Sequence, residues 1–274
     1  MNGTELDRLI YWPVTGRVEV QVRLIWLLSC LMVLLVVPAK AMASENQDIA
    51  LALAVDVSIS VSEEEKDLQR RGYIEAFRSR EVIDAIMSGP YGAIAVTYFE
   101  WSGAIEPSVV VPWFVIDSEA AAHEFADRLS RSTELRKDTT SISGALLFAQ
   151  ELLNMRRGRA RKLILDVSGD GPNNHGIPVE EARDRLVADG IIINGLPIMV
   201  NANDANAGFD LSELDSYYRD RVIGGNGAFL ISVLSWREFP DSVQRKLVLE
   251  ISGGRGGTAR PKPTLNVQYK KGEP

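Results

Sequence analysis

Two carboxylates and several hydroxyls stand in three short segments whose residue types suit metal coordination. The first segment, residues 56–60, reads Asp-Val-Ser-Ile-Ser and presents Asp56, Ser58 and Ser60 at alternating positions. Thr140 precedes an amphipathic helix pattern, and Asp170 stands between two glycines. Because no His or Cys belongs to this set, its oxygen ligands suit a hard divalent cation such as Mg²⁺, Mn²⁺ or Ca²⁺ better than zinc. A cation with so few protein anions around it stays electrophilic, so an acidic group from a partner can complete its coordination.

The three segments are predicted to meet at one edge of a sheet. From residue 47 onward, short runs rich in β-branched residues alternate with helical patterns, which indicates a doubly wound, Rossmann-like α/β fold with helices on both faces. Six strands are predicted, at residues 49–57, 92–101, 108–115, 162–167, 191–197 and 228–233. The third follows the second after a short connection and is therefore expected to be an antiparallel edge strand in an otherwise parallel sheet. Ligand sites of such sheets lie at the carboxyl ends of the strands.

Capping signals mark where the helices begin. Ser62 and Glu65 form a capping box, Asp117 or Ser118 can cap the next helix, and Pro178 can sit in a first turn. Apolar stripes at helical spacing follow from residues 142 and 239, and both are interpreted as core. Two glycines after residue 252 end the last helix, and residues 253–274 are expected to form a flexible tail.

The order of these motifs resembles the metal-ion-dependent adhesion site of von Willebrand factor A domains. The shared marks are Asp-x-Ser-x-Ser after the first strand, a Thr at a helix start with Ala145 and Leu146 behind it, and Asp-Gly after the fourth strand. The resemblance covers residues 47–252. It implies that Ser58, Ser60 and Thr140 are direct or water-bridged ligands, with Asp56 and Asp170 as the carboxylates. Two positions differ from the usual pattern: residues 168–169 read Ser-Gly where Thr is common, and Ser143 stands where Gly is usual.

Four further residues are predicted to lie near the bound ligand. Glu100 and Trp101 end the second strand, and Asn173 and His175 belong to the segment after the fourth strand. Two interpretations of the first pair stay open. Trp101 either covers the end of the core while Glu100 is solvated, or forms an aromatic anchor beside the ion while Glu100 reaches the metal shell or repels wrong partners. The run at residues 98–103, together with residues 168–174, resembles a bacterial secreted subgroup of the superfamily with no assigned function.

Two other functional classes compete with a binding module. Residues 169–174, Gly-Asp-Gly-Pro-Asn-Asn, resemble the late metal motif of haloacid-dehalogenase phosphoryl-transfer enzymes, in which Asp56 would be the nucleophile. That mechanism needs a second Asp two positions later, where this chain has Ser58, so no enzyme activity is expected. The third class is a metal-free structural domain whose hydroxyls only cap helices.

The amino-terminal segment predicts export. Residues 24–37 are almost wholly apolar, follow Arg17 and Arg23, and lead into small residues, which is the layout of a signal peptide. We expect residues 1–43 to be removed, or retained as a membrane anchor, and residues 44–252 to form the domain in the periplasm or outside the cell. Membrane contact is expected only through an uncleaved amino-terminal segment. The net charge of −7 argues against a nucleic-acid partner. The expected partner is a protein or peptide with an acidic group.

Overall fold

The computed structural model describes residues 46–58, 61–103, 107–131, 140–200 and 210–253. Ser60, the predicted signal segment and residues 254–274 lie outside the described residues. The strands are β1 (Gln47–Asp56), β2 (Ile94–Trp101), β3 (Ser108–Ile116), β4 (Ala160–Gly169) and β5 (Ile191–Pro197). The helices are α2 (Glu63–Arg78), α3 (Arg80–Met87), α4 (Glu119–Ser130), α5 (Ile142–Asn154), α6 (Val179–Ala188), η2 (Leu211–Glu213), α7 (Leu214–Tyr217), η3 (Tyr218–Val222), η4 (Trp236–Glu238) and α8 (Phe239–Ser252).

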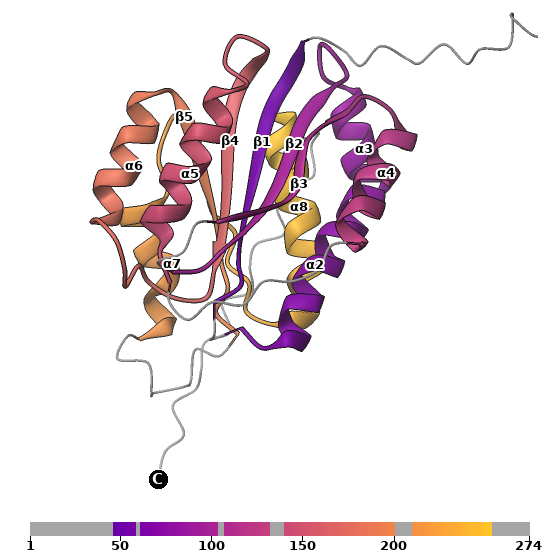
Figure 1. The fold of residues 1–274 in the computed structure, drawn as a ribbon. Coiled ribbons are helices and arrows are strands. Elements are labelled where there is room, and N and C mark those ends of the chain that lie inside the picture. The colour runs from indigo at the N-terminus through magenta and orange to yellow at the C-terminus, as the bar shows by residue number, and fades with distance from the viewer. Residues whose placement is uncertain (1–45, 59–60, 104–106, 132–139, 201–209, 254–274) are drawn as a thin grey trace, which may run out of the picture. The chain divides into compact units, whose positions relative to one another are not determined.

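The sheet confirms the predicted doubly wound α/β architecture. Its strand order is β3-β2-β1-β4-β5, and β1 pairs in parallel with both β2 and β4. β3 is antiparallel to β2 at the edge, as its short connection predicted. Helices α2, α3, α4 and α8 lie on one side of the sheet and α5 and α6 on the other (Figure 1). The carboxyl ends of the parallel strands therefore share one edge, where the three candidate segments lie.

The predicted sixth strand at residues 228–233 is wrong. This segment runs beside β5 but makes only two isolated bridges with it or the residue after it, Gly195 with Leu230 and Ile198 with Val233. The Gly195 N–H donates to the Phe229 carbonyl, and the Val233 N–H donates to the Pro197 carbonyl. Pro197 stands between these bridges and has no N–H to donate, so the ladder cannot continue through it.

The central strand β1 explains how the two helical layers fit. All ten of its residues are buried. Its larger side chains, such as Leu51 and Leu53, pack into the cluster under α2, α3, α4 and α8, whereas Ala50 and Ala52 belong to the cluster under α5 and α6. Alternation of side chains across a strand produces this division, and the small alanine side chains let α5 approach the sheet closely.

The helix caps agree with the sequence signals in most places. Ser62 and Glu65 form the predicted capping box at α2, and Ser118 caps α4. Gly253 ends α8 with a φ of 62°, a left-handed conformation that glycine adopts without strain. Pro178 lies at the N-cap of α6, one residue before the first turn. Helix α3 was not predicted, because its eight residues carry too short an apolar pattern to identify.

The two hydrophobic core clusters of the described residues are formed by side chains that follow the predicted signal segment. Residues Ala43–Pro274 form one compact unit, and every buried member of the two core clusters lies between Ile49 and Leu247. A chain beginning at residue 44 therefore retains every residue of these two clusters and is expected to fold by itself. No helix in the described ranges is both long and apolar enough to cross a bilayer.

A buried ion cluster joins α8 to the sheet. The Lys246 ammonium lies 2.5 Å from a carboxylate oxygen of Asp166 on β4 and 2.5 Å from one of Glu250. Asn194 on β5 donates a further hydrogen bond to Glu250 at 2.9 Å. Burial, and after it the charge of Asp166, raises the pKa of Glu250 to about 7 although Lys246 opposes the shift. One cation thus serves two carboxylates, and one of them is readily protonated near neutral pH.

Replacement of Glu250 by Gln should change how stability depends on pH. A carboxyl whose pKa is higher in the folded state stabilises the fold below its unfolded pKa, and this contribution is lost as the pH rises through the folded value. Wild type should therefore lose stability between about pH 5 and pH 8, and Glu250→Gln should lose roughly 2–3 kcal/mol less over that window. Urea unfolding at several pH values measures the difference, with Asp84→Asn on the exposed surface of α3 as control. Parallel curves for wild type and Glu250→Gln would contradict the assignment.

Candidate metal centre

Asp56 ends the central strand as a fully buried carboxyl group. One of its oxygens, Oδ1, accepts a hydrogen bond from the Ser58 N–H at 2.8 Å. The other, Oδ2, is buried and has no hydrogen-bond partner among the described residues. Burial, and after it the charge of Asp170, raises the pKa of Asp56 from 3.8 to about 8. An ionised carboxylate in this position is unfavourable unless a positive neighbour or further hydrogen bonds stabilise it.

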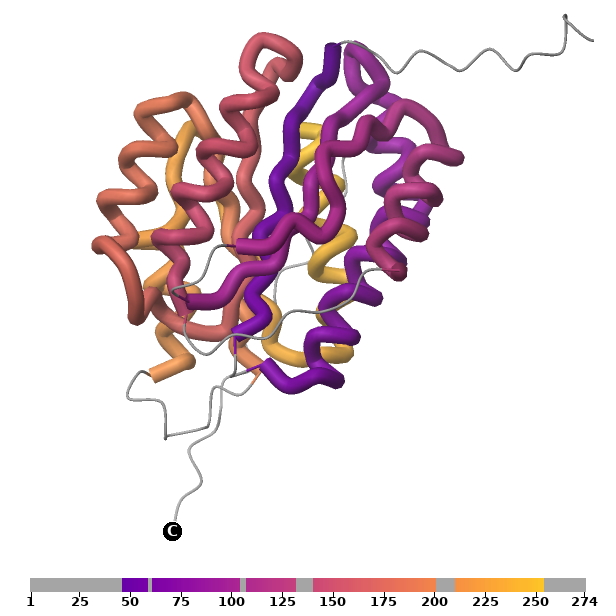
Figure 2. Tube along the Cα trace, viewed as in Figure 1, coloured from indigo at the N-terminus to yellow at the C-terminus, as the bar shows by residue number. Residues whose placement is uncertain are grey.

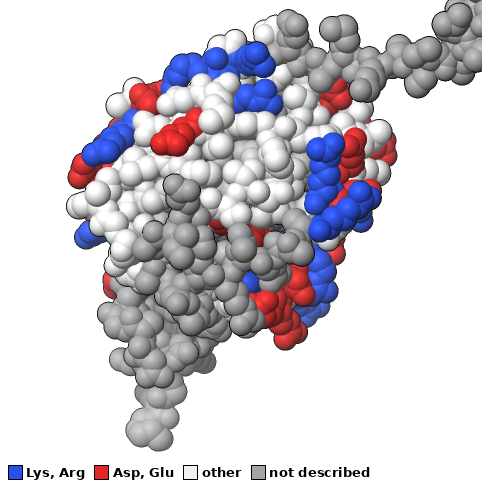
Figure 3. Space-filling view, in the orientation of Figure 1, with Lys and Arg blue, Asp and Glu red and all other residues white. Residues whose placement is uncertain are grey.

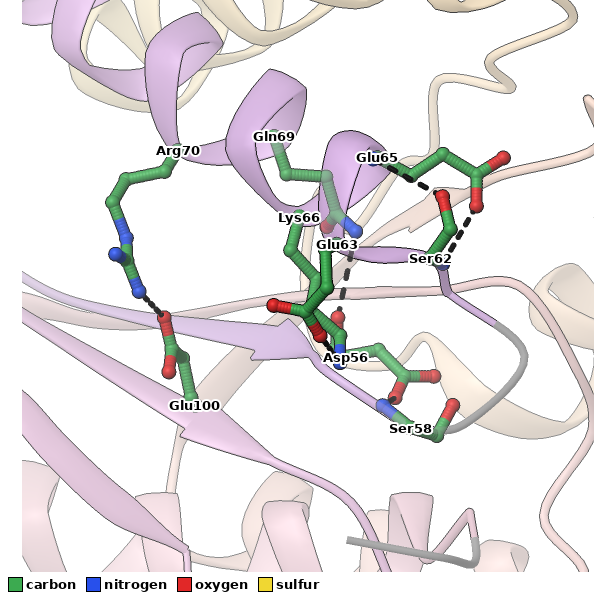
Figure 4. A network of polar contacts seen from close by, with 9 residues as sticks. All are labelled: Asp56, Ser58, Ser62, Glu63, Glu65, Lys66, Gln69, Arg70 and Glu100. Carbon is green, nitrogen blue, oxygen red and sulfur yellow. Dashed lines mark hydrogen bonds and ion pairs between the residues drawn. The ribbon is translucent and has the colours of Figure 1, made fainter. Parts of the chain in front are cut away.

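The first loop holds Asp56 and Ser58 close together (Figure 4). Ser58 is 1% exposed and its carbonyl accepts from the Val61 N–H, so the chain turns sharply into α2. The Gln69 side chain donates to the carbonyl of Asp56 at 3.4 Å and ties this turn to α2. The position of Ser60 in the site remains a prediction.

Gly169 brings the end of β4 into contact with Asp56. A Cβ placed on Gly169 would lie 3.0 Å from Asp56 Oδ2, 2.8 Å from the Tyr218 hydroxyl and 3.3 Å from the Trp101 ring. No side chain fits there, which explains why Gly stands directly before Asp170. The charge of Asp170 contributes to the raised pKa of Asp56, so the two predicted carboxylate ligands are near neighbours.

The start of α5 is fastened to the third loop by reciprocal hydrogen bonds. The Thr140 N–H donates to Asn174 Oδ1, and the Asn174 N–H donates to the Thr140 carbonyl, both at 3.1 Å. Asn173 Oδ1 accepts from the Ser143 N–H at 3.0 Å. The Ser143 hydroxyl donates to the His175 carbonyl at 3.3 Å, a contact that a glycine at position 143 could not make. These bonds fix where Thr140 stands relative to the loop that carries Asp170.

Asn173 and His175 therefore contribute to the site by hydrogen bonds that hold its loops together. Asn173 also receives support from the Tyr217 hydroxyl, which accepts its backbone N–H at 3.1 Å. The His175 side chain is exposed, and its backbone carbonyl is the group that binds the Ser141 and Ser143 hydroxyls. Sequence reasoning did not single out Asn174, although its side chain caps the Thr140 N–H.

The burial of Trp101 agrees with the first sequence interpretation, whereas the buried position of Glu100 does not. Glu100 is not solvated: it is 4% exposed and pairs with Arg70 of α2 at 2.5 Å, apart from Asp56 and Ser58 (Figure 4). Trp101 is 1% exposed and so is not a surface anchor, yet its ring lies beside Gly169 in the core under the metal loops. The alternation of β2 places the two side chains on opposite faces of the sheet, which accounts for their separate environments.

Tyr218 is a residue of the site that sequence reasoning missed. It opens the π-helical turn η3, is fully buried, and its hydroxyl has no hydrogen-bond partner among the described residues. Burial, followed by the charges of Asp56 and Asp170, holds the pKa of Tyr218 well above 10, so the hydroxyl stays protonated. Short π-helical turns recur at functional sites, but no simple residue pattern predicts them from sequence.

A small hollow opens beside Asp170 on the surface of the same edge. It is lined by Glu65, Asp170, Ile198, Val200, Leu211 and Trp236. The Trp236 indole donates to Glu65 at 2.9 Å, and Leu234 nearby in sequence is 61% exposed. The aromatic residue that lines the surface at this edge is therefore Trp236, because Trp101 is buried in the core.

The donors of the described structure fit a hard divalent cation. No group of three or more His, Cys, Asp or Glu side chains lies together in the described ranges, so a zinc-type cluster is not formed there. The predicted ligands are all oxygen atoms, and one of them, Asp56 Oδ2, is buried without a hydrogen-bond partner among the described residues. Oxygen ligands are those that hard divalent cations prefer.

The comparison with protein families gives one match. Residues 46–255 match the family described as "Protein of unknown function (DUF1194)". The chain belongs to this family. No curated protein matches the chain.

Solved structures show the fold of this DUF1194 chain. It is similar to proximal thread matrix protein 1 from the mussel byssus, with a TM-score of 0.52 and 15% identity over 76% of this chain and 48% of that one. It is also similar to the pilus adhesin SpaC from Lactobacillus rhamnosus GG, with a TM-score of 0.56 and 11% identity over 77% of this chain and 31% of that one. The DUF1194 chain thus spans less than half the length of either neighbour. Its fold is that of a von Willebrand factor A domain.

Substitution of Gly169 by Ala should perturb both the fold and the site. The added methyl group meets the buried Tyr218 hydroxyl and Asp56 Oδ2, so we expect the free energy of unfolding to fall by about 1–3 kcal/mol. Gly171→Ala is the matched control, because a Cβ at Gly171 has no neighbour within 4 Å. Urea unfolding of both variants measures the effect. Equal stability of the two variants would show that the Gly169 contact is not tight in solution.

Proposed function

We propose that this DUF1194 domain is an exported binding module that holds a divalent cation and through it binds an acidic group on a protein or peptide. The proposed ligands are Asp56, Ser58, Ser60, Thr140 and Asp170. The observation that carries the proposal is the buried Asp56 carboxyl, whose Oδ2 has no partner among the described residues while the Asp170 charge lies nearby. Mg²⁺ is the expected ion, with Mn²⁺ or Ca²⁺ as alternatives.

The two carboxylates and the hydrogen bonds of the α5 segment favour cation binding at this site. The buried Asp56 carboxylate and the partly exposed Asp170 carboxylate repel one another when both are ionised, and a divalent cation would remove that repulsion. When bound, it would supply an electrophilic position open to a partner's carboxylate. The hydrogen bonds between Thr140 and Asn174 keep the α5 segment in place before any ion arrives, so little order needs to be gained on binding.

The surface beside Asp170 suits recognition of a partner. Glu65 and Asp170 line the hollow together with Trp236, and these two acidic residues would repel an acidic partner in the absence of a cation. Partially exposed aromatic residues provide much of the binding energy at protein interfaces. The similar solved structures are a byssus matrix protein and a pilus adhesin, which supports protein binding as the kind of role to test first.

An enzymatic role is not part of this proposal. In the haloacid-dehalogenase mechanism a carboxylic acid two positions after Asp56 shuttles the proton. Ser58 occupies that position, and its backbone N–H is already bound to Asp56 Oδ1. Assay of an aryl phosphate separates the two functions: metal-dependent hydrolysis that is lost on Asp56→Asn would support the enzyme.

Removal of Asp170 should abolish cation binding without unfolding the domain. Calorimetric titration of residues 44–274 with Mg²⁺, Mn²⁺ and Ca²⁺ should give a binding signal for wild type and none for Asp170→Ala. Loss of one charge also relieves repulsion at Asp56, so the metal-free variant should melt no lower than metal-free wild type. Asp84→Ala on α3 is the control and should bind like wild type. The absence of a calorimetric binding signal from wild type with all three ions would contradict the proposal.

Cation binding should tighten as the pH rises. Asp56 must lose its proton to coordinate a cation, and its pKa in the metal-free domain is about 8. Affinity should therefore increase by up to about tenfold per pH unit below that value and level off above it. Calorimetry near neutral pH in buffers of different ionisation enthalpy should detect about one proton released per ion. A pH-independent affinity with no proton release would show that Asp56 is not the titrating ligand.

A further inference from the structure

The edge of the sheet opposite the metal loops carries a concentration of positive charge. The turn between α5 and β4 reads Arg-Arg-Gly-Arg-Ala-Arg-Lys over residues 156–162, in a chain of net charge −7. Figure 3 shows Lys and Arg side chains gathered at the upper end of the molecule, where this turn lies in Figure 1. We call residues 155–162 the basic turn.

The charges of the basic turn are largely directed to solvent. Arg159 and Lys162 are exposed, and neither forms an ion pair among the described residues. Arg157 is exposed and bonds to neutral oxygens of Asn154 and the Asp189 backbone. Positive charge therefore remains available at this edge for an external anion.

Two further basic residues and two acids at this edge contact specific neighbours. Arg156 stacks on the Trp113 ring, with its guanidinium carbon 5.1 Å from the ring centre. Arg161 lies 3.6 Å from Asp48, and Gln150 donates to the Asp189 carboxylate at 2.6 Å. The basic turn thus keeps an excess of cations after these contacts are counted.

Exposed apolar side chains surround the same turn. Met155 is 67% exposed at the end of α5, and Met87 and Tyr91 are 38% and 47% exposed in and after the last turn of α3. The edge is continuous, because Asp48 accepts the Tyr91 N–H and also faces Arg161. Basic residues alternating with exposed apolar and aromatic tips are typical of surfaces that bind the membrane interface.

The first strand of the described structure begins at this edge too. The Gln47 N–H donates to the Arg159 carbonyl at 2.8 Å, so β1 begins beside the basic turn, as the tube in Figure 2 also shows. Only residues 38–46 separate Gln47 from the apolar run at residues 24–37, and nine residues span at most about 30 Å. A cavity of about 490 Å³ opens here, lined in part by Arg161 and Lys162.

From this arrangement we infer that the basic turn, with Met87, Tyr91 and Met155, is a docking surface for an anionic phospholipid membrane. Arginine and lysine heads would pair with lipid phosphates while the methionine and tyrosine side chains enter the interface. A nucleic acid or soluble polyanion would use the charge but gain nothing from Met155. In the docked domain the metal loops, at the opposite edge of the sheet, face away from the bilayer and toward a partner. The inference does not depend on cation binding.

Vesicle co-sedimentation of residues 44–274 in the presence of EDTA tests this surface. Wild type should bind vesicles of phosphatidylcholine mixed with phosphatidylglycerol and should bind phosphatidylcholine alone far more weakly. The double variant Arg159→Gln/Lys162→Gln should bind the mixed vesicles at least about tenfold more weakly, since each basic side chain near an anionic surface contributes roughly a fivefold factor. Arg128→Gln/Arg131→Gln, with the same charge change at the far end of α4, should bind like wild type.

A second variant separates a membrane from other anions. Met155→Ser should weaken binding to the mixed vesicles several-fold and leave binding to heparin unchanged, because only a bilayer accepts the methionine side chain. The inference is overturned if wild type does not bind the anionic vesicles, if both double variants weaken binding equally, or if heparin binds while vesicles do not. Circular dichroism melting of each variant verifies that it is folded. If the double variant does not fold, Met155→Ser still tests the surface.

Discussion

The whole candidate site is organised around one buried carboxyl group at the end of the central strand. Asp56 lies where β1 leaves the core, so its side chain has no water to solvate a charge, and its Oδ2 has no partner among the described residues. Gly169 permits the close approach of β4, and the protonated Tyr218 hydroxyl stands on the other side of the same gap. A carboxylate in such a place is unfavourable alone and favourable beside a cation, which is why the surrounding loops matter.

The loops around Asp56 are held together by hydrogen bonds between uncharged groups. Asn173, Asn174 and the hydroxyls of Ser141 and Ser143 link α5 to the loop after β4 without adding any charge. The site therefore keeps its shape whether or not Asp56 is ionised. The charged groups of the proposed ligand set are only the two carboxylates, and its hydroxyl ligands are neutral, so a bound divalent ion would not be surrounded by excess negative charge that repels an acidic partner.

The two edges of the sheet have opposite electrostatic character. The carboxyl edge presents Asp170 and Glu65 beside Trp236, while the other edge presents the basic turn and exposed methionines. Between them, the Lys246 cluster ties α8 to β4 inside the core. A parallel sheet sends all its strands in one direction, so loops at its two ends can evolve separate binding properties without disturbing the core.

The sequence by itself determined the fold class, the antiparallel edge strand and most of the helix caps, because each depends on local spacing, propensity or a short ordered pattern. The metal ligands that it indicates stay a prediction. It failed at residues 228–233, where a β-rich run is kept from forming a strand by Pro197 in the neighbouring chain segment, and no local pattern contains that fact. Only the tertiary structure decided that Glu100 pairs with Arg70, that Trp101 is buried, and that Tyr218 and Trp236 stand near Asp56 and Asp170. These contacts join segments more than 25 residues apart, and their outcome depends on how helices pack over a sheet edge.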